Sequence, residues 1–317
     1  LKPTIKTGAF LLKKYSFCLF LPAILIAALF LGCKTLPIAA VQKEVDALKL
    51  LDGNSAFYIK IPTAVDRDLV SRMVLSSVKE ISENEAGQIA DRVNTVYAGL
   101  TRKFSKSEIQ ISASCDVPEI FLPRIFSVKN GWKLRKLSFS EKMPANVYTV
   151  YNNGSLDVSF PSKKIACIGR SVEQMLARYD TILSGDDDSS AENITAGENN
   201  SHLLDSSIYD WLSCGENEIR FSAVAPQSFL TVLTGANLNF KLLYVRGKMV
   251  KSPQNDSHYL MDLEFEFADR KFVPAAKGAL SLAFGLTDSN VILETPTHLA
   301  VTHIKIEKNA LYKILVL

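Results

Sequence analysis

The stretch HYLMDLEFEFA, residues 258–268, alternates between apolar and acidic side chains along its second half. The apolar residues are Leu263, Phe265 and Phe267, and the acidic residues between them are Asp262, Glu264 and Glu266. Successive side chains of a β-strand point to opposite faces of a sheet, so a period of two predicts a strand with one buried and one solvated face. Strands of this kind are typical of antiparallel sheets. The segment therefore predicts a fold built on an antiparallel sheet.

The sequence around this strand predicts an α+β unit over residues 204–317. We expect strands at 217–225, 239–251, 290–294 and 298–306, and helices at 206–213, 226–236 and 270–286. Pro226 and Gly235 mark the start and the end of the middle helix. The last helix carries small residues that favour close packing on a sheet: Ala275, Ala276, Ala279 and Ala283. A membrane-facing or ligand-lining helix is the alternative interpretation of that segment.

A second unit with the same order of elements is predicted over residues 55–183. After a strand at 55–62, helices are expected at 64–81, 82–100, 118–127 and 171–183, with strands at 107–115, 131–139, 146–153, 155–160 and 164–169. Ser82 and Glu85 have the spacing of a capping box, which predicts a helix start. Asn153 and Gly154 predict a tight hairpin turn.

Both halves thus contain, in this order, a strand, a helix, several strands and a helix. The predicted fold class is α+β, with two similar units of antiparallel sheet and helices packed on one face of each. The two units could also pack into one continuous body. Residues 184–203 are polar and acidic and lack aromatic residues, so we predict a flexible linker there. Its acids lack the spacing of a calcium loop, and no metal site is predicted.

The N-terminal segment has the pattern of an export signal. The apolar stretch Tyr15–Leu31 follows four basic residues, Lys2, Lys6, Lys13 and Lys14, and no acidic residue precedes Glu44. A basic region followed by an apolar region is typical of a secretory signal. The stretch is also long enough to be an uncleaved membrane helix with cytoplasmic lysines. Both interpretations place the rest of the chain outside the cytoplasm.

Cys33 distinguishes these interpretations. The residues Phe30-Leu31-Gly32 before it resemble the lipobox of bacterial lipoproteins, although Phe30 replaces the usual Leu. This departure resembles the relaxed lipoboxes of spirochaete lipoproteins, and the rest of the chain has a diffuse likeness to uncharacterised treponemal lipoproteins. The resemblance implies a signal peptide over residues 1–32, cleavage between Gly32 and Cys33, and acylation of Cys33 with palmitate-like chains. Residues 33–54 would then be the lipidated cysteine and its tether. A plain cleaved signal remains the third alternative.

Charge and composition limit the partners. The chain carries 36 basic and 33 acidic residues, and four of the basic ones lie in the leader, so the remainder is close to neutral. Phosphate backbones require a concentrated basic surface, which argues against nucleic acid as a partner. The expected partners are a membrane, reached through the acyl chains on Cys33, and a protein or a small hydrophobic ligand.

Three cysteines follow the leader: Cys115, Cys167 and Cys214. Their spacing matches no zinc or redox motif. One disulfide and one free thiol would be consistent with this number. We interpret Cys115 and Cys167 as buried residues of strands, and Cys214, at a helix end, as the exposed thiol.

No catalytic residue or cofactor is predicted. Ser76 and Lys79 fit the S-x-x-K pattern of penicillin-recognising serine enzymes, and Tyr151-Asn-Asn153 fits their Y-x-N pattern. The required K-T-G occurs only in the leader, so this resemblance implies no activity. Asp66 and Asp68 are more simply explained as acids at a helix start. The histidines, His202, His258, His298 and His303, are interpreted as surface or half-buried residues; the last two would point to opposite faces of one strand.

The predicted function is a lipid-anchored extracytoplasmic protein of the cell envelope with a non-enzymatic binding or structural role. A carrier of a lipid or another hydrophobic ligand, and an envelope hydrolase without a recognisable motif, are the alternatives. A large apolar cavity beneath residues 271–286 would favour the carrier. A polar cleft with Asp, Glu and His from both halves would favour the enzyme. A filled core with an exposed apolar patch would favour a protein-binding role.

Overall fold

The computed structural model describes residues 44–77, 81–103, 106–139, 146–184, 203–224, 226–234, 240–284, 291–293 and 295–309. The chain divides into two units, Leu1–Glu44 and Val45–Leu317, and the description below concerns the second. The predicted signal peptide 1–32 and Cys33 lie outside the described residues. So does most of the predicted linker, residues 185–202.

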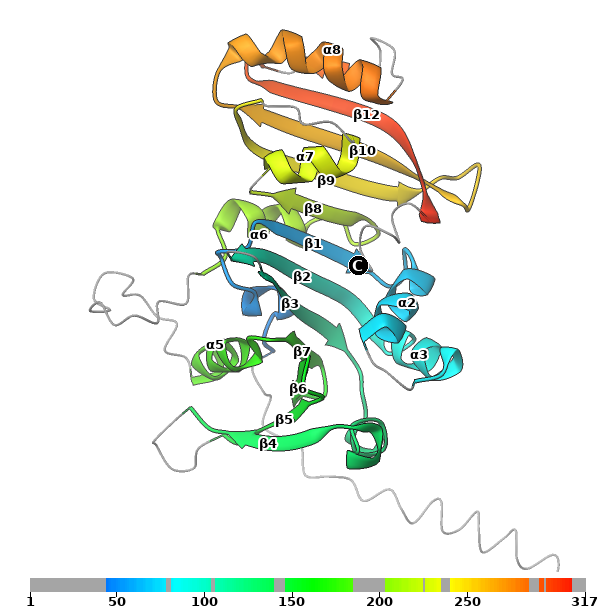
Figure 1. The fold of residues 1–317 in the computed structure, drawn as a ribbon, viewed down its shortest axis with the longest axis vertical. Helices are drawn as coiled ribbons and strands as arrows, with labels where there is room; N and C mark the ends of the chain where they lie inside the picture. Colours follow the sequence, from blue (N-terminus) through cyan, green and yellow to red (C-terminus); the bar gives the residue numbers. More distant parts are fainter. Residues whose placement is uncertain are drawn as a thin grey trace, which may run out of the picture. The chain divides into compact units, whose positions relative to one another are not determined.

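A single antiparallel sheet of 12 strands runs through the described residues (Figure 1). Its order is β11-β12-β10-β9-β8-β1-β2-β3-β7-β6-β5-β4. The strands are β1 (Phe57–Pro62), β2 (Val93–Lys103), β3 (Lys106–Cys115), β4 (Lys133–Leu137), β5 (Tyr148–Asn152), β6 (Asp157–Ser162), β7 (Ile165–Gly169), β8 (Ile219–Ala223), β9 (Leu242–Lys251), β10 (His258–Phe267), β11 (Val291–Leu293) and β12 (His298–Glu307). The alternation at 258–268 is confirmed, because every second residue of β10 is buried.

Seven α-helices accompany this sheet in the described part of the chain. They are α2 (Arg67–Ser77), α3 (Glu83–Ala90), α4 (Leu122–Ile125), α5 (Val172–Ser184), α6 (Ser206–Ser213), α7 (Pro226–Thr234) and α8 (Val273–Phe284). Short 3-10 helices occur at η1 (Ala47–Leu50), η2 (Glu119–Phe121), η3 (Val128–Asn130) and η4 (Arg270–Phe272). The predicted α+β class with an antiparallel sheet is confirmed.

The expected helix over residues 82–100 is wrong in its second half. The helix begins as predicted, with a capping box between Ser82 and Glu85, but it ends at Ala90. The chain then enters β2 at Val93. Residues 93–97 are rich in β-branched and aromatic side chains, which fit a pleated surface better than a helix. Pairing with both β1 and β3 gives this segment more burial than an isolated helix could.

Helices pack on both faces of the sheet, whereas the sequence led us to expect one face. A first core contains residues of α2, α4, α7 and α8, and Figure 1 shows α7 and α8 over β9 and β12. A second core contains residues of η1, α5 and α6. Adjacent residues of β1 belong to different cores, Tyr58 to the second and Ile59 to the first. The cores therefore lie on opposite faces, because neighbouring residues of a strand point in opposite directions.

Ala276 and Leu280 of α8 are buried in the first core, while Leu282 is 86% exposed. This agrees with close packing of the small-residue helix on the sheet. None of the described helices is both long enough and apolar enough to cross a membrane.

Strand β1 connects the two halves of the sheet. It pairs with β2 on one side and with β8 on the other, so the sheet passes from the first predicted unit into the second without a break. The division into units 55–183 and 204–317 stays a prediction, and the backbone hydrogen bonds show that the two share one sheet.

A buried carboxylate adds a second connection between the halves. Asp66 precedes α2, and its side chain accepts a hydrogen bond from the Leu69 amide at 3.1 Å. The hydroxyl of Tyr259 on β10 also donates to Asp66, and the Lys308 ammonium lies 3.3 Å from the same carboxylate. Removing one partner of a buried charge costs more than a surface pair contributes, because the remaining group loses its compensation. Asp66 thus does more than compensate a helix dipole.

The three described cysteines are free thiols. Cys115 lies in the first core and Cys167 in the second, so neighbouring strands place them on opposite faces of the sheet. Cys214 follows α6 and is exposed. Burial raises the pKa of Cys115 to about 12 and also raises the pKa of Cys167. The predicted environments of all three cysteines are confirmed.

We expect Tyr259→Phe to lower the free energy of unfolding by about 1–3 kcal/mol, because a buried carboxylate loses a donor. Urea unfolding of protein beginning at Lys34 measures this. Tyr97→Phe is the matched control, since the half-buried Tyr97 hydroxyl has no hydrogen bond to the described residues. Equal losses in the two variants would contradict a special role of Asp66.

We expect alkylation of the native protein at pH 8 to modify Cys214 first. Cys115 and Cys167 should react at least ~100-fold more slowly, because burial removes access and suppresses the thiolate. Quantification of the three cysteine-containing peptides over time gives the rates, and unfolding in urea should make them equal. Rapid native labelling of Cys115 would show that its strand is not packed as described.

Candidate functional site

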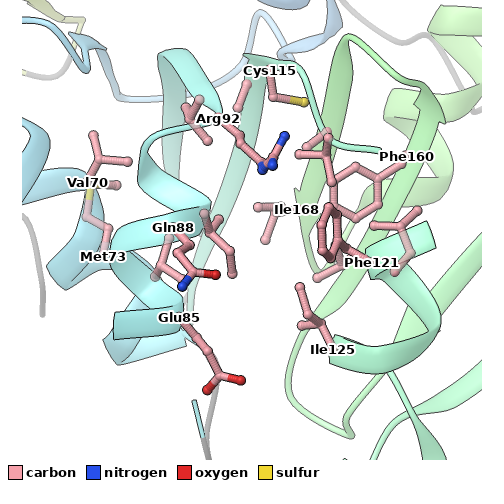
Figure 2. Close-up of a pocket in the computed structure, with 18 of the residues that line it drawn as sticks. Val70, Met73, Glu85, Gln88, Arg92, Cys115, Phe121, Ile125, Phe160 and Ile168 are labelled. Carbon is pink, nitrogen blue, oxygen red and sulfur yellow. The ribbon is translucent and has the colours of Figure 1, made fainter. Parts of the chain in front are cut away.

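A cavity of about 940 Å³ lies on the first-core face of the sheet, within the first predicted unit (Figure 2). Helices α2 and α3 form one side, and the segment of η2 and α4 forms the other. The floor consists of side chains from β2, β3, β6 and β7. The volume falls within the range of ~300–1,000 Å³ that is usual for small-molecule sites.

Apolar side chains dominate the floor because of the strand period. Val96, Ile111, Ala113, Val158 and Ile168 line the cavity, and each takes an alternate position on its strand. Their neighbours along the strands point to the second core or to solvent. Ala113 and Ala166 are small, which leaves free volume above β3 and β7 where larger residues would fill it.

One wall is the pair α2–α3, held together by a charged contact. The Arg67 guanidinium pairs with Asp91, with Nη2 2.9 Å from Oδ2, and Nη2 also donates to the Gly87 carbonyl at 3.0 Å. A Cβ at position 87 would lie 3.0 Å from Nη2, so glycine permits this close approach. Val70 and Met73 of α2 then face the cavity, as Figure 2 shows.

The opposite wall rests on an aromatic cluster. Phe126, directly after α4, makes an edge contact with Trp132 at 4.9 Å between ring centroids and a stacked contact with Tyr151 at 4.8 Å. These contacts fix the position of α4, from which Ile125 reaches the cavity in Figure 2. Ile120, which precedes the lining residue Phe121, is 81% exposed.

Polar groups at the cavity are few. Glu85 belongs to the capping box, where its carboxylate accepts hydrogen bonds from the Ser82 amide at 3.0 Å and hydroxyl at 2.8 Å. Hydrogen bonds from Ser82 hold the pKa of Glu85 below its usual range. Gln88 and Arg92 also line the cavity, and the Arg92 guanidinium carbon lies 5.1 Å from the centre of the Phe121 ring. The cavity can therefore hold an apolar molecule with a small polar part.

The residues of the penicillin-enzyme patterns have structural roles. The Ser76 hydroxyl donates to the Met73 carbonyl within its own helix at 2.9 Å, and Lys79 lies outside the described residues. The Asn153 side chain accepts from the Ser155 and Leu156 amides at 3.1 and 2.9 Å, and Gly154 has a φ of +90°. This is the predicted tight turn.

The described histidines do not gather at the cavity. His298 lies 3.3 Å from Glu266, and His258 contacts the Ser257 hydroxyl at 2.9 Å. His303 occupies a bulge of β12 opposite Asp262, with a φ of +64°. The prediction that His298 and His303 point to opposite faces assumed a regular strand between them. The bulge inserts one residue there, so that prediction is wrong. His202 lies outside the described residues, among which no three His, Cys, Asp or Glu side chains could hold a metal ion.

The sequence interpretation missed the cavity itself. It extended the helix at 82–100 through Arg92 and Val96, two residues of the cavity lining, and so left no strand to form the floor. The β-branched and aromatic residues at 93–97 were the available signal. The shape of the cavity, however, depends on how far α4 stands from α3, which no local pattern encodes.

Comparisons with known proteins identify the fold and the family. Residues 42–312 match the family of the outer membrane-associated lipoprotein TP0453. Crystal form I of TP0453 is 20% identical, with a TM-score of 0.63, covering 86% of this chain and 97% of that one. Crystal form III is 19% identical, with a TM-score of 0.61, covering 86% and 98%. No curated protein sequence matches the chain.

These matches confirm the predicted resemblance to treponemal lipoproteins. They also confirm the predicted localisation, a membrane-anchored extracytoplasmic protein of the cell envelope. The chain belongs to the family of the outer membrane-associated lipoprotein TP0453.

Proposed function

We propose that this envelope lipoprotein is a non-enzymatic carrier that holds a hydrophobic ligand, such as an acyl chain, in the cavity between α3 and α4. The observation that carries the proposal is the cavity of about 940 Å³ with an apolar floor. Transfer of apolar ligand surface from water into such a site is favourable by ~25 cal/mol per Å². The acyl anchor would confine this binding body to a membrane surface, where hydrophobic ligands are concentrated.

The cavity favours a carrier over an enzyme. Its lining contains no histidine, and its two acidic residues, Glu85 and Asp91, are occupied by Ser82 and Arg67. All its lining residues belong to the first half, so it is not a polar cleft between halves. A general acid or base requires a free titratable group beside the substrate, and these acids have structural partners.

The cavity also favours a carrier over a purely structural protein. Strands β2, β3, β6 and β7 have apolar side chains on a face that α2, α3 and α4 cover incompletely. The cavity does not lie beneath residues 271–286, the position named above as favouring a carrier, because Ala276 and Leu280 pack directly on the sheet there, as predicted. Apolar surface that a protein leaves uncovered on this scale is characteristic of a binding site.

The anchor in this proposal is Cys33. Cleavage between Gly32 and Cys33 would leave a tether over residues 33–54, and two or more acyl chains would hold the protein stably. The end of this segment is part of the body, since Leu48, Leu50 and Leu51 are buried in the second core.

We expect Ala113→Phe to weaken binding of a fluorescent 16-carbon probe about tenfold, because an overpacked site costs ~1–3 kcal/mol. Equilibrium titration of protein beginning at Lys34 measures the Kd. Ala275→Phe, at an exposed position of α8, is the matched control and should leave the Kd unchanged. Thermal unfolding checks that both variants fold. An unchanged Kd in the folded Ala113→Phe variant would reject the cavity as the binding site.

We expect the native protein to have an intact mass that starts at Cys33 and includes acyl chains, and to enter the detergent phase on partitioning. Cys33→Ala should show neither the added acyl mass nor entry into the detergent phase. The thiol that would be acylated is absent, and the N-terminal amine that cleavage before Cys33 would create is lost with it. A full-length Cys33→Ala chain that stays in the membrane would instead indicate an uncleaved helix.

A further inference from the structure

We infer that the ligand of this cavity is a single-chain amphiphile with an anionic head, and that Arg92 binds the head. This inference rests on the proposed function and adds the chemical class of the ligand. The largely apolar lining of the cavity contains a charged group, the guanidinium of Arg92. A guanidinium keeps its positive charge at any physiological pH, so an apolar cavity that contains one is not suited to a neutral hydrocarbon alone.

The backbone fixes Arg92 at the cavity. It lies in the turn between α3 and β2, where its amide donates to the Ile89 carbonyl at 3.0 Å and its carbonyl accepts from the Asp116 amide at 2.7 Å. Val93, the next residue, pairs with Cys115 on β3. The side chain therefore starts from a rigid point, and Figure 2 shows it extending into the cavity.

The contacts of the Arg92 side chain leave its charge uncompensated. Its guanidinium lies over the Phe121 ring at 5.1 Å, which is a weak attraction, and Arg92 is half-buried. No carboxylate of the described residues forms an ion pair with it. A half-buried guanidinium without an ion pair to the described residues can give charge-assisted hydrogen bonds to an anion, and these are stronger beside an apolar floor than in bulk water.

The nearby acids are engaged elsewhere. The Arg67 guanidinium pairs with Asp91 and holds the pKa of that carboxyl below its usual range. Glu85 accepts two hydrogen bonds from Ser82. Both acids are ionised and partnered at neutral pH, so neither is available to Arg92. Arg124, the other basic residue of the lining, is exposed and lies on the α4 side.

The geometry thus places a cation above an apolar floor. A head with a carboxylate or a phosphate would take charge-assisted hydrogen bonds from Arg92, while one acyl chain would lie over Ile111, Ala113 and Val158. A neutral molecule of equal length would fill the same floor and leave Arg92 without a partner. We therefore expect the cavity to bind a long-chain carboxylic acid more tightly than the alcohol of the same chain length.

The test uses the full chain in phosphatidylcholine vesicles with two photoactivatable 16-carbon probes, a carboxylic acid and the corresponding primary alcohol. The quantity compared is the acid-to-alcohol ratio of labelling on cavity peptides, relative to the wild-type protein. Arg92→Met should lower this ratio about tenfold, because a hydrogen bond to a charged group is lost. Arg92→Lys should recover part of it, and Arg170→Met, at an exposed position without a cavity contact, should leave it unchanged.

Competition with unlabelled hexadecanoic acid and hexadecyl phosphate distinguishes the two head groups, and displacement of the acid probe by either supports the inference. Equal labelling by acid and alcohol, unchanged in Arg92→Met, would overturn the inference and leave the proposed carrier intact. Absence of cavity labelling by both probes would overturn the carrier as well. Circular dichroism of each variant confirms that loss of labelling is not loss of the fold.

Discussion

The pairing of β1 with both β2 and β8 is the constraint on which the rest of the structure depends. These six residues must satisfy two neighbouring strands and both cores at once, with Ile59 and Ile61 in the first core and Tyr58 in the second. Even Lys60 is buried, and its ammonium donates to the carbonyls of Cys214 and Gly215 at 2.8 and 3.0 Å. Burial lowers the pKa of Lys60, a cost that these carbonyls offset.

The cavity follows from how the first core is covered. Over β9, β10 and β12 the helices α7 and α8 pack small and branched side chains directly on the sheet. Helix α2 is tied to the other half of the sheet, because Asp66 at its start is bound to Tyr259 and Lys308. Helix α4 is held at its own position by Phe126 and the aromatic rings around it. The two walls are thus fixed by separate contacts, and the floor between them stays uncovered.

Much of the architecture could be predicted from local patterns. The alternation at 258–268, the capping box at Ser82 and the turn at Gly154 each depend on neighbouring residues and were confirmed. The errors concern contacts between distant segments. The pairing of β2 with both β1 and β3 ends the helix that starts at Ser82 earlier than the local pattern predicts, and the bulge at His303 depends on its contact with Asp262. The cavity depends on two walls from different helices, so the sequence named none of its charged residues as a site.

The sheet separates the cavity from η1 and the residues that follow it. Residues of η1 pack in the second core, and the buried Arg178 donates to the Leu50 carbonyl at 2.6 Å. Two residues further on, Tyr58 and Gln110 hold Asp52 through its carbonyl at 2.7 Å and its amide at 2.8 Å. The cavity opens on the other face, in the first core. The contacts that hold η1 and the walls of the cavity therefore lie on opposite faces of the sheet.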